Sequence, residues 1–442
     1  MSPESGVLSP ECGRPITNHQ SLSTNHLIVS TKILNDPIHG FITVPHPLLL
    51  RLIDHPWFQR LRYIKQLGLS HLVYPGALHT RFHHALGAMH LMGLAIESLR
   101  GKGHVITEEE ALGAHVAILL HDIGHGPFSH ALEHSLVEGI SHEDVGALVM
   151  ERLNAEFKGA LDLGIAIFHD RYPKHVLHQL VSGQLDVDRM DYLNRDSFYT
   201  GVSEGVIGAD RIIKMLQVVD DRLVVEEKAI YSIEKFIVAR RLMYWQVYLH
   251  KTVVACEQML VQTLRRAKFL GLQGVPLFGS PALLGFLTHR RDRASFEEPS
   301  VLADFMRLDD HDIMGALKVW ADHPDPVLSR LASDLLGRHT LRIRLRTKPW
   351  DPAQVTMIRQ EVARQLNITE KEAGLFVLTD RLENNAYDNS DGGIKLLFKD
   401  GRLEDIAEAS DNLGISAMSG TVEKHYLAFP RWLGKEWFEA NS

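Results

Sequence analysis

Histidine and aspartate residues recur at three places in the first half of the chain, and they are the residues best suited to chemistry. His121 and Asp122 are adjacent, His84 stands 37 residues before His121, and Asp188 follows in an acidic segment. Imidazole and carboxylate groups together suit Mn, Fe, Zn or Mg, and two of each would complete a ligand shell. A His-Asp pair alone more often forms a surface contact. The prediction of a metal site therefore depends on the fold bringing three separate segments together.

Helical patterns surround all three segments. Apolar residues at spacings of three and four predict a helix pair over 49–67 and a helix over 81–99. Thr107 followed by Glu110 fits a capping box for a helix that we expect to run to about Ile123, where a Gly-Pro turn ends it. Further helices are predicted from near Pro127 or Ser129 and over 143–153, 174–182, 187–194, 209–218 and 232–269.

The chain after residue 270 has a different pattern. Glycine and proline crowd 271–281, which predicts a boundary between two regions. The sequence predicts a mainly α protein, with a mobile tail over 1–30, an all-helical core over 31–270 and a smaller α+β C-terminal lobe over 271–442. The helices expected in that lobe cover 304–320 and 327–337, and the strands cover 341–347, 373–379, 393–398 and 422–429.

Length, charge and cysteine content narrow the class of protein. The 442 residues are 45% hydrophobic, enough for a large buried core, and no apolar run approaches the roughly 20 residues of a membrane span. For that reason no membrane partner is expected. A net charge of −8 provides no global positive field, so we expect no nucleic-acid partner either. Cys12 and Cys256 are far apart in unlike contexts, which argues against a disulfide framework. A cytoplasmic location is therefore predicted.

Five ordered blocks of sequence, spread over about residues 30 to 270, resemble one known family. That family is the HD-domain deoxynucleoside triphosphate triphosphohydrolases, in the branch that contains the human sterile-alpha-motif and HD-domain enzyme and its bacterial relatives. Five blocks in matching order are far more specific than the His-Asp pair alone. The blocks are Asn35–Gly40, Phe58–Gly68, Arg81–Gly87, His121–His130 and Asp186–Tyr192.

The resemblance implies a reaction and the residues that carry it. The ligands of one divalent ion (Mn, Fe, Zn or Mg) would be His84, His121, Asp122 and Asp188, with Mg2+ accompanying the nucleotide. Enzymes of this branch release intact triphosphate from the sugar 5′-oxygen, so water attacks the α-phosphorus. A metal-activated water and a general acid suit this step. The residues that would line the reacting phosphate are His125, His130, Glu133 and His142, with Glu133 orienting His130 as the acid and His142 assisting or replacing it.

The resemblance also assigns residues to the substrate. Tyr192 would pack on the deoxyribose and leave no room for a 2′-hydroxyl, whereas Leu249 replaces a glutamine that faces the base in the mammalian relative. For each phosphate-binding arginine, an ion pair on a helix surface is the alternative. The residues expected at the phosphates are Arg81, Arg189, Arg240 and Lys65, and those expected near the sugar or base are Gln66, Leu67, Asp196 and Tyr248.

Members of this branch often carry a nucleotide activator site at a subunit interface. Asp54, Gln59 and Arg62 match its guanine-reading positions, and the same spacing also makes an exposed helix face. Asn35 would extend the pocket, whereas Gln246 replaces an arginine of the mammalian relative. GTP or a dNTP would be the activator, and a homo-oligomer, dimer or tetramer, is expected. The alternative functions are hydrolysis of a nucleoside monophosphate or cyclic nucleotide, and non-catalytic nucleotide sensing.

Overall fold

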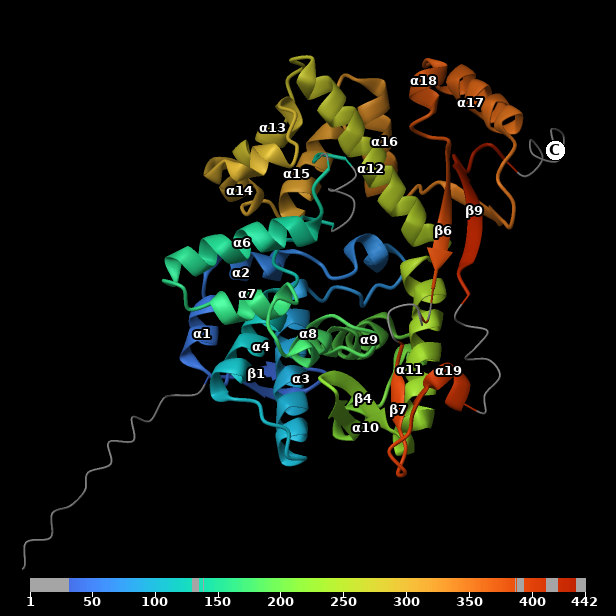
Figure 1. Cartoon of the computed structure of the whole chain (residues 1–442). Coiled ribbons are helices and arrows are strands. Elements are labelled where there is room, and N and C mark those ends of the chain that lie inside the picture. Colours follow the sequence, from blue (N-terminus) through green and yellow to red (C-terminus); the bar gives the residue numbers. More distant parts are fainter. Residues whose placement is uncertain are drawn as a thin grey trace, which may run out of the picture.

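Helices make up most of the protein, and one long helix links two groups of them (Figure 1). In this computed structural model, α12 (Lys251–Leu272) runs from the helices that carry the predicted ligands to a second group of helices, with a sheet beside it. The mainly α fold and the smaller C-terminal region with short sheets are confirmed. The structure describes residues 32–128, 135–137, 139–385, 387, 393–410 and 420–434.

Three helices form the part of the core that carries the predicted metal ligands. α3 (Arg81–Gly101) packs against both α4 (Glu108–Leu120) and α9 (Val187–Thr200). The predicted capping box begins α4: the Glu110 amide donates to the Thr107 hydroxyl at 3.2 Å, and the Thr107 amide donates to the Glu110 carboxylate at 2.8 Å. The helix ends just before the His-Asp pair, which therefore lies in the following turn.

Shorter helices surround these three. The helix pair predicted over 49–67 consists of two short α-helices and a 3-10 turn. Pro47 and Pro56 begin the helices, and the imidazoles of His46 and His55 accept hydrogen bonds from their first turns. The surrounding helices are α1 (Pro47–Ile53), α2 (Pro56–Gln59), α6 (His142–Glu156), α7 (Asp162–Phe168), α8 (His175–Val181) and α10 (Ala209–Met215), with 3-10 turns at Arg60–Tyr63, Gly68–Leu72, Ser203–Gly205 and Glu227–Ala229.

Two antiparallel hairpins add strands to the helical core. β1 (Ile33–Asp36) pairs with β2 (Gly40–Thr43), and β3 (Leu216–Val219) pairs with β4 (Arg222–Glu226). The helix predicted over 209–218 ends at Met215, and the chain continues as β3. β-branched residues favour the strands, and two aspartates with positive φ close the second hairpin. The expectation that this part of the chain is purely helical missed both hairpins.

The single helix predicted over 232–269 is interrupted. α11 (Ile230–Met243) passes into a π-helical turn at Tyr244–Tyr248 before α12 begins. Within this turn, the Gln246 carbonyl accepts a hydrogen bond from the Tyr74 hydroxyl, a residue distant in sequence. Turns of this kind occur often at functional sites. The sequence pattern did not indicate the interruption, because the residues on both sides of the turn are helical.

The region after α12 combines helices with two sheets. One sheet is antiparallel, in the order β5-β9-β6, and the other has the order β3-β4-β7-β8 with β4 and β7 parallel. The second sheet contains strands from before and after residue 270. The sheet therefore crosses the predicted domain boundary, which stays a prediction. The strand predicted over 373–379 is wrong for most of its length, since a short helix precedes β6. The elements are α13 (Pro281–Thr288), α14 (Pro299–Phe305), α15 (Asp310–Trp320), α16 (Pro326–Leu336), β5 (Arg342–Arg346), α17 (Pro352–Leu366), α18 (Glu370–Ala373), β6 (Leu378–Asn384), β7 (Lys395–Leu397), β8 (Leu403–Asp405), α19 (Ile406–Ala409) and β9 (Val422–Phe429), with a 3-10 turn at Ala294–Glu297.

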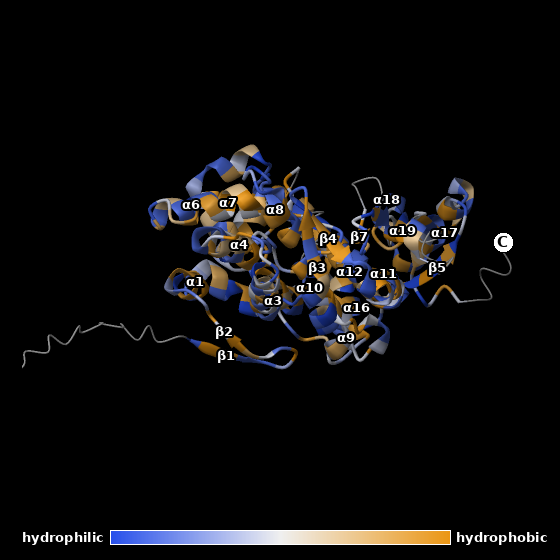
Figure 2. Ribbon diagram, turned by 60° about the horizontal axis from the view of Figure 1, so that its bottom comes forward, coloured by the Kyte–Doolittle hydropathy of each residue, from blue (hydrophilic) through white to orange (hydrophobic). Residues whose placement is uncertain are grey.

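Apolar side chains fill the space between these elements. Phe58, Phe236 and Trp320 are among the largest fully buried side chains, and Figure 2 shows that β4 is among the most apolar segments. A smaller cluster, which includes Ile358 and Leu427, joins α17 to the β5-β9-β6 sheet. Among the described helices, none combines the length and the apolar character that crossing a membrane requires.

Candidate metal centre

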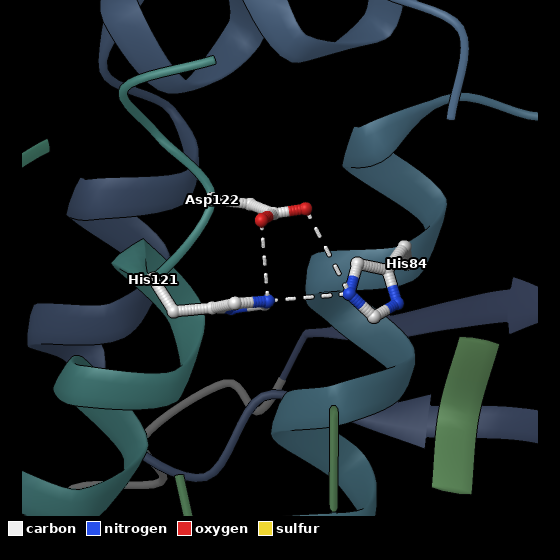
Figure 3. A group of neighbouring side chains, drawn as sticks. All are labelled: His84, His121 and Asp122. Atoms are coloured by element: carbon white, nitrogen blue, oxygen red, sulfur yellow. Dashed lines mark hydrogen bonds and ion pairs between the residues drawn. The ribbon is translucent and has the colours of Figure 1, made fainter. Parts of the chain in front are cut away.

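Four side chains predicted as metal ligands lie together between α3, α4 and α9. The Nε2 atoms of His84 and His121 are 3.2 Å apart, and His84 Nε2 lies 2.9 Å from an Asp188 carboxylate oxygen. His121 Nε2 lies 3.5 Å from Asp188 and 3.5 Å from Asp122. Figure 3 shows His84, His121 and Asp122 pointing toward one another from two segments. These three residues form a group that could hold a metal ion.

The chemistry of this donor set fits a divalent cation. His84 Nδ1 lies 2.8 Å from the Asp191 carboxylate, and His121 Nδ1 lies 2.6 Å from the Ile118 carbonyl oxygen. Both partners only accept hydrogen bonds, so Nδ1 carries the proton in each neutral imidazole. Both Nε2 atoms then present lone pairs to each other and to the carboxylates. A cation at their centre, or a proton on one Nε2, relieves this repulsion.

The pKa directions agree with a site that attracts positive charge. Burial lowers the pKa of His84, but hydrogen bonds to Asp188 and Asp191 outweigh it and raise the pKa to about 10. Burial raises the pKa of the Asp122 carboxyl, but Arg81 and the neighbouring histidines outweigh it and hold that pKa well below its usual range. Protons and a metal ion therefore compete for the same atoms, so we expect metal affinity to fall as the pH is lowered.

A buried network of charged side chains orients His84 through its Nδ1 atom, on the side of the ring opposite Nε2. The Asp191 carboxylate contacts His84, accepts from Arg195 Nε at 2.8 Å and lies 2.6 Å from His39 Nε2. Arg195 also donates to Asp36 at 2.8 Å. The sequence interpretation did not assign a role to these residues, although Asp36, His39 and Asp191 all lie within the blocks that carry the family resemblance. The helical spacing of Asp188, Asp191 and Arg195 was the available signal.

The close approach of α3 and α9 depends on Gly87. A Cβ atom there would lie 2.0 Å from Asp191 Oδ1 and 2.2 Å from Arg195 Nη2. We expect Gly87→Ala to lower the free energy of unfolding by about 1–3 kcal/mol, because neither charged group has room to move. Gly101→Ala is the matched control, since nothing lies within 4 Å of a Cβ at that end of α3. Urea unfolding of both variants measures the difference, and equal stabilities would contradict the expectation.

His125 and His142 lie beside the ligand group. Their rings stack with centroids 3.8 Å apart, and His125 Nε2 lies 3.2 Å from an Asp122 carboxylate oxygen. The other Asp122 oxygen accepts a hydrogen bond from Arg81. Burial and the nearby Arg81 lower the pKa of His125 to about 3, so this imidazole is neutral at physiological pH. His130 and Glu133, together with the helix predicted from near Ser129, lie outside the described residues.

The residues predicted at the sugar also lie near one another. Tyr192 lies close to both His84 and Tyr248, with ring centroids 6.5 and 6.2 Å away. Tyr248 donates from its hydroxyl to Asp196 at 2.8 Å, and the other Asp196 oxygen lies 2.7 Å from His79 Nε2. His79 was not predicted. Its contact with Asp196 spans more than a hundred residues, so no local pattern indicates it.

The other residues predicted to bind the substrate differ in their contacts and in their burial. Arg189 lies 3.3 Å from Asp186, and its Nη1 atom is buried without a hydrogen-bond partner among the described residues. The guanidinium of Arg240 lies 5.9 Å from the centroid of the Tyr244 ring, and the backbone amide of Gln66 donates to the His79 carbonyl at 3.0 Å. Leu67 is partly buried against the core, and Lys65 forms an ion pair with Asp310 at 3.3 Å.

The residues predicted for an activator lie on or near the surface. Asp54, Arg62 and Asn35 are exposed. Gln59 donates to the Ile53 carbonyl at 2.7 Å and accepts from Arg62 at the same distance. Hydrogen bonds within the protein therefore occupy the Gln59 side-chain amide. This arrangement also fits the alternative interpretation, an ordinary exposed helix face.

Comparisons with known proteins give a consistent family. An HD domain matches residues 81–196, and an HD associated region matches residues 207–269. The chain is 31% identical to the uncharacterized protein YwfO of Bacillus subtilis, over 92% of this chain and 94% of that protein. Human SAMHD1, a deoxynucleoside triphosphate triphosphohydrolase, is 30% identical over 53% of this chain and 44% of its own length.

A solved structure is similar over nearly the whole chain. A phosphohydrolase of Bacteroides thetaiotaomicron has a TM-score of 0.88 and 55% sequence identity, covering 91% of this chain and all of that one. By contrast, the chain spans about half the length of the SAMHD1 relatives that it matches. The resemblance seen in the sequence is confirmed. This chain belongs to the HD-domain phosphohydrolase family, and its relatives include the SAMHD1 triphosphohydrolases.

Proposed function

We propose that this protein hydrolyses deoxynucleoside triphosphates to deoxynucleoside and inorganic triphosphate. The observation that supports this most is the convergence of two histidine Nε2 atoms and two carboxylates, with the stacked His125 and His142 beside them. Relatives named as triphosphohydrolases support the choice of substrate. A phosphohydrolase name alone, as in the Bacteroides structure, leaves the substrate class open.

In the proposed mechanism, His84, His121, Asp122 and Asp188 hold one divalent ion. When bound, such an ion supplies a water of lowered pKa and neutralises charge on the phosphate. Water oxygen bonds to the α-phosphorus and loses a proton to solvent, the bond from phosphorus to the 5′-oxygen breaks, and the departing oxygen takes a proton. His130, oriented by Glu133, is the proposed donor of that proton, with His142 as its alternative. His125, whose Nε2 lies 3.2 Å from the Asp122 carboxylate, lines the reacting phosphate beside this group.

The substrate's charge and sugar have their own proposed partners. Arg189 offers a buried guanidinium nitrogen without a partner among the described residues, which suits a phosphate oxygen. Arg81 and Arg240 complete the phosphate contacts, and Mg2+ accompanies the nucleotide. Tyr192 packs on the deoxyribose. Gln66, Leu67, Asp196 and Tyr248 face the sugar or base.

We also propose a nucleotide-activated, cytoplasmic homo-oligomer. Asp54, Gln59, Arg62 and Asn35 would bind GTP or a dNTP. The family relationship to SAMHD1 supports this, and the exposure of three of these side chains is compatible with it. An activator site formed between subunits would make activity depend on pairs of nucleotides.

Product analysis tests the proposed reaction. The protein is incubated with Mn2+ or Mg2+ and each dNTP, alone, in pairs and with GTP, and phosphorus NMR identifies the products. We expect inorganic triphosphate and deoxynucleoside. Orthophosphate alone, or hydrolysis only of nucleoside monophosphates or cyclic nucleotides, would replace this proposal with another HD-domain phosphohydrolase activity. No hydrolysis, with nucleotide binding retained, would indicate a sensor.

A further inference from the structure

An aspartate from the region after α12 holds the turn that follows the His-Asp pair. Asp310, the first residue of α15, is only 1% exposed. Its Oδ1 atom accepts a hydrogen bond from the Phe128 amide at 3.0 Å. Its Oδ2 atom accepts from the Lys65 amide at 3.1 Å and from the Lys65 ammonium at 3.3 Å. One carboxylate therefore joins three segments that are distant in sequence.

The backbone held by this carboxylate has an unfavourable conformation. Phe128 has φ of 52°, in the left-handed region that residues with a side chain rarely adopt. Such a conformation persists only where the surroundings fix it, and it occurs preferentially at active sites. Gly68 lies beside this turn, since a Cβ there would be in ordinary contact with Phe128 Cα at 3.9 Å. The Lys65 ammonium lies 5.8 Å from the Phe128 ring centroid.

Asp310 itself lies on a fixed support. Asp309 caps α15, and its amide donates to the Asp312 carboxylate at 2.9 Å in a capping box. Just before it, the Leu308 carbonyl accepts a hydrogen bond from the buried Arg60 at 2.6 Å. The beginning of α15 is thus tied both to its own first turn and to the HD-domain side of the molecule. The Asp310 carboxylate is thus fixed by its own helix on one side and by the Phe128 and Lys65 amides on the other. It therefore holds these two segments at a set distance.

The two loops that Asp310 joins flank the proposed reaction site. Phe128 follows His125 by three residues and precedes His130 in the sequence. Lys65 directly precedes Gln66, whose backbone amide donates a hydrogen bond to the His79 carbonyl. A change in the separation of these loops would therefore shift phosphate-side residues relative to sugar-side residues.

We propose that Asp310 is a positioning residue for hydrolysis. It sets the spacing between the turn at Phe128 and the loop at Lys65, so that the region after α12 completes a site whose metal ligands all precede it. This inference rests on the proposed function for its kinetic consequence. The hydrogen bond from the Phe128 amide to the Asp310 carboxylate does not depend on the proposed function.

The test compares Asp310→Ala, Asp310→Asn and Leu317→Ala in the full chain. Leu317 is fully buried seven residues further along the same helix, so its variant controls for loss of α15 packing. We expect Asp310→Ala to lower kcat on the order of 10²-fold, as a small misplacement of reacting groups does, with a smaller change in KM. Asp310→Asn keeps an oxygen for the Phe128 amide and should recover part of kcat. Leu317→Ala should lower Tm and leave kcat near that of the wild type.

Two further readouts separate positioning from unfolding. Each Asp310 variant should still bind one Mn2+ per chain, because no ligand is altered. Hydrogen exchange of the peptide over 121–128 should be faster in Asp310→Ala than in Leu317→Ala. Unchanged kcat in Asp310→Ala, or equal losses in both variants, would overturn the inference. If the wild type does not hydrolyse dNTPs, the proposed function fails instead, and the exchange comparison alone then decides the role of Asp310.

Discussion

We expect replacement of either residue of the His-Asp pair to abolish the proposed metal binding and almost all of the proposed hydrolysis. His121→Ala removes one of two imidazole nitrogens that lie 3.2 Å apart, and Asp122→Ala removes the carboxylate that His121, His125 and Arg81 share. We expect activity to fall about a thousandfold or more, since losing a metal-activated water costs several kcal/mol of transition-state stabilisation. Metal content of the purified protein and the initial rate with Mn2+ measure both effects.

The control for this prediction is a histidine outside the site. His175 contacts Asp170 at 2.7 Å on the surface of α8, so His175→Ala should keep both metal content and rate. Retention of one metal ion per chain by His121→Ala, with activity near that of the wild type, would show that the ion binds elsewhere. Loss of folding in the Ala variants would appear in circular dichroism, and His121→Gln then provides a variant of closer size.

Arg195→Met will cause the largest loss of stability among the substitutions considered. The Arg195 side chain is fully buried between Asp36 and Asp191, which are 4% and 0% exposed. Removing the guanidinium leaves two buried carboxylates without their cation. Breaking a buried pair in this way costs about 3–5 kcal/mol. Urea unfolding followed by circular dichroism measures the change, and the metal affinity should fall as well because Asp191 orients His84.

A surface arginine supplies the comparison for Arg195. Arg364 pairs with Glu361 at 2.7 Å, but its side chain is 71% exposed. Arg364→Met should therefore change stability by less than about 1 kcal/mol. If both variants lost the same free energy of unfolding, the buried pairs of Arg195 with Asp36 and Asp191 would contribute no more to stability than a surface pair.

The convergence of His84, His121 and Asp122 could be anticipated from the ordered family blocks together with the helices predicted around them. His84, His121 and Asp122 each lie at the start or end of a helix with a clear periodicity or cap, and those helices form close to where they were expected. The family blocks supplied the order of the segments. The existence of a long helix such as α3 is easier to predict from sequence than its ends or its distant contacts.

What sequence reasoning missed depends on contacts between distant segments. The link from His79 to Asp196 and the link from Asp310 to Phe128 join residues that no local periodicity relates. The hairpin formed by β1 and β2 is short, and its alternation is too brief to distinguish it from a loop. The π-helical turn at Tyr244–Tyr248 arises inside an uninterrupted helical pattern, where Tyr74 bonds to its backbone from outside.

The position of bond cleavage tests the central claim most directly. Hydrolysis of a dNTP by the Mn2+-loaded protein is carried out in water enriched in heavy oxygen, and mass spectrometry locates the label in the products. Attack at the α-phosphorus predicts the label in inorganic triphosphate and none in the deoxynucleoside. Label in orthophosphate would mean attack at the terminal phosphate, and label in the deoxynucleoside would mean attack at the sugar carbon. Either of those results would contradict the proposed reaction.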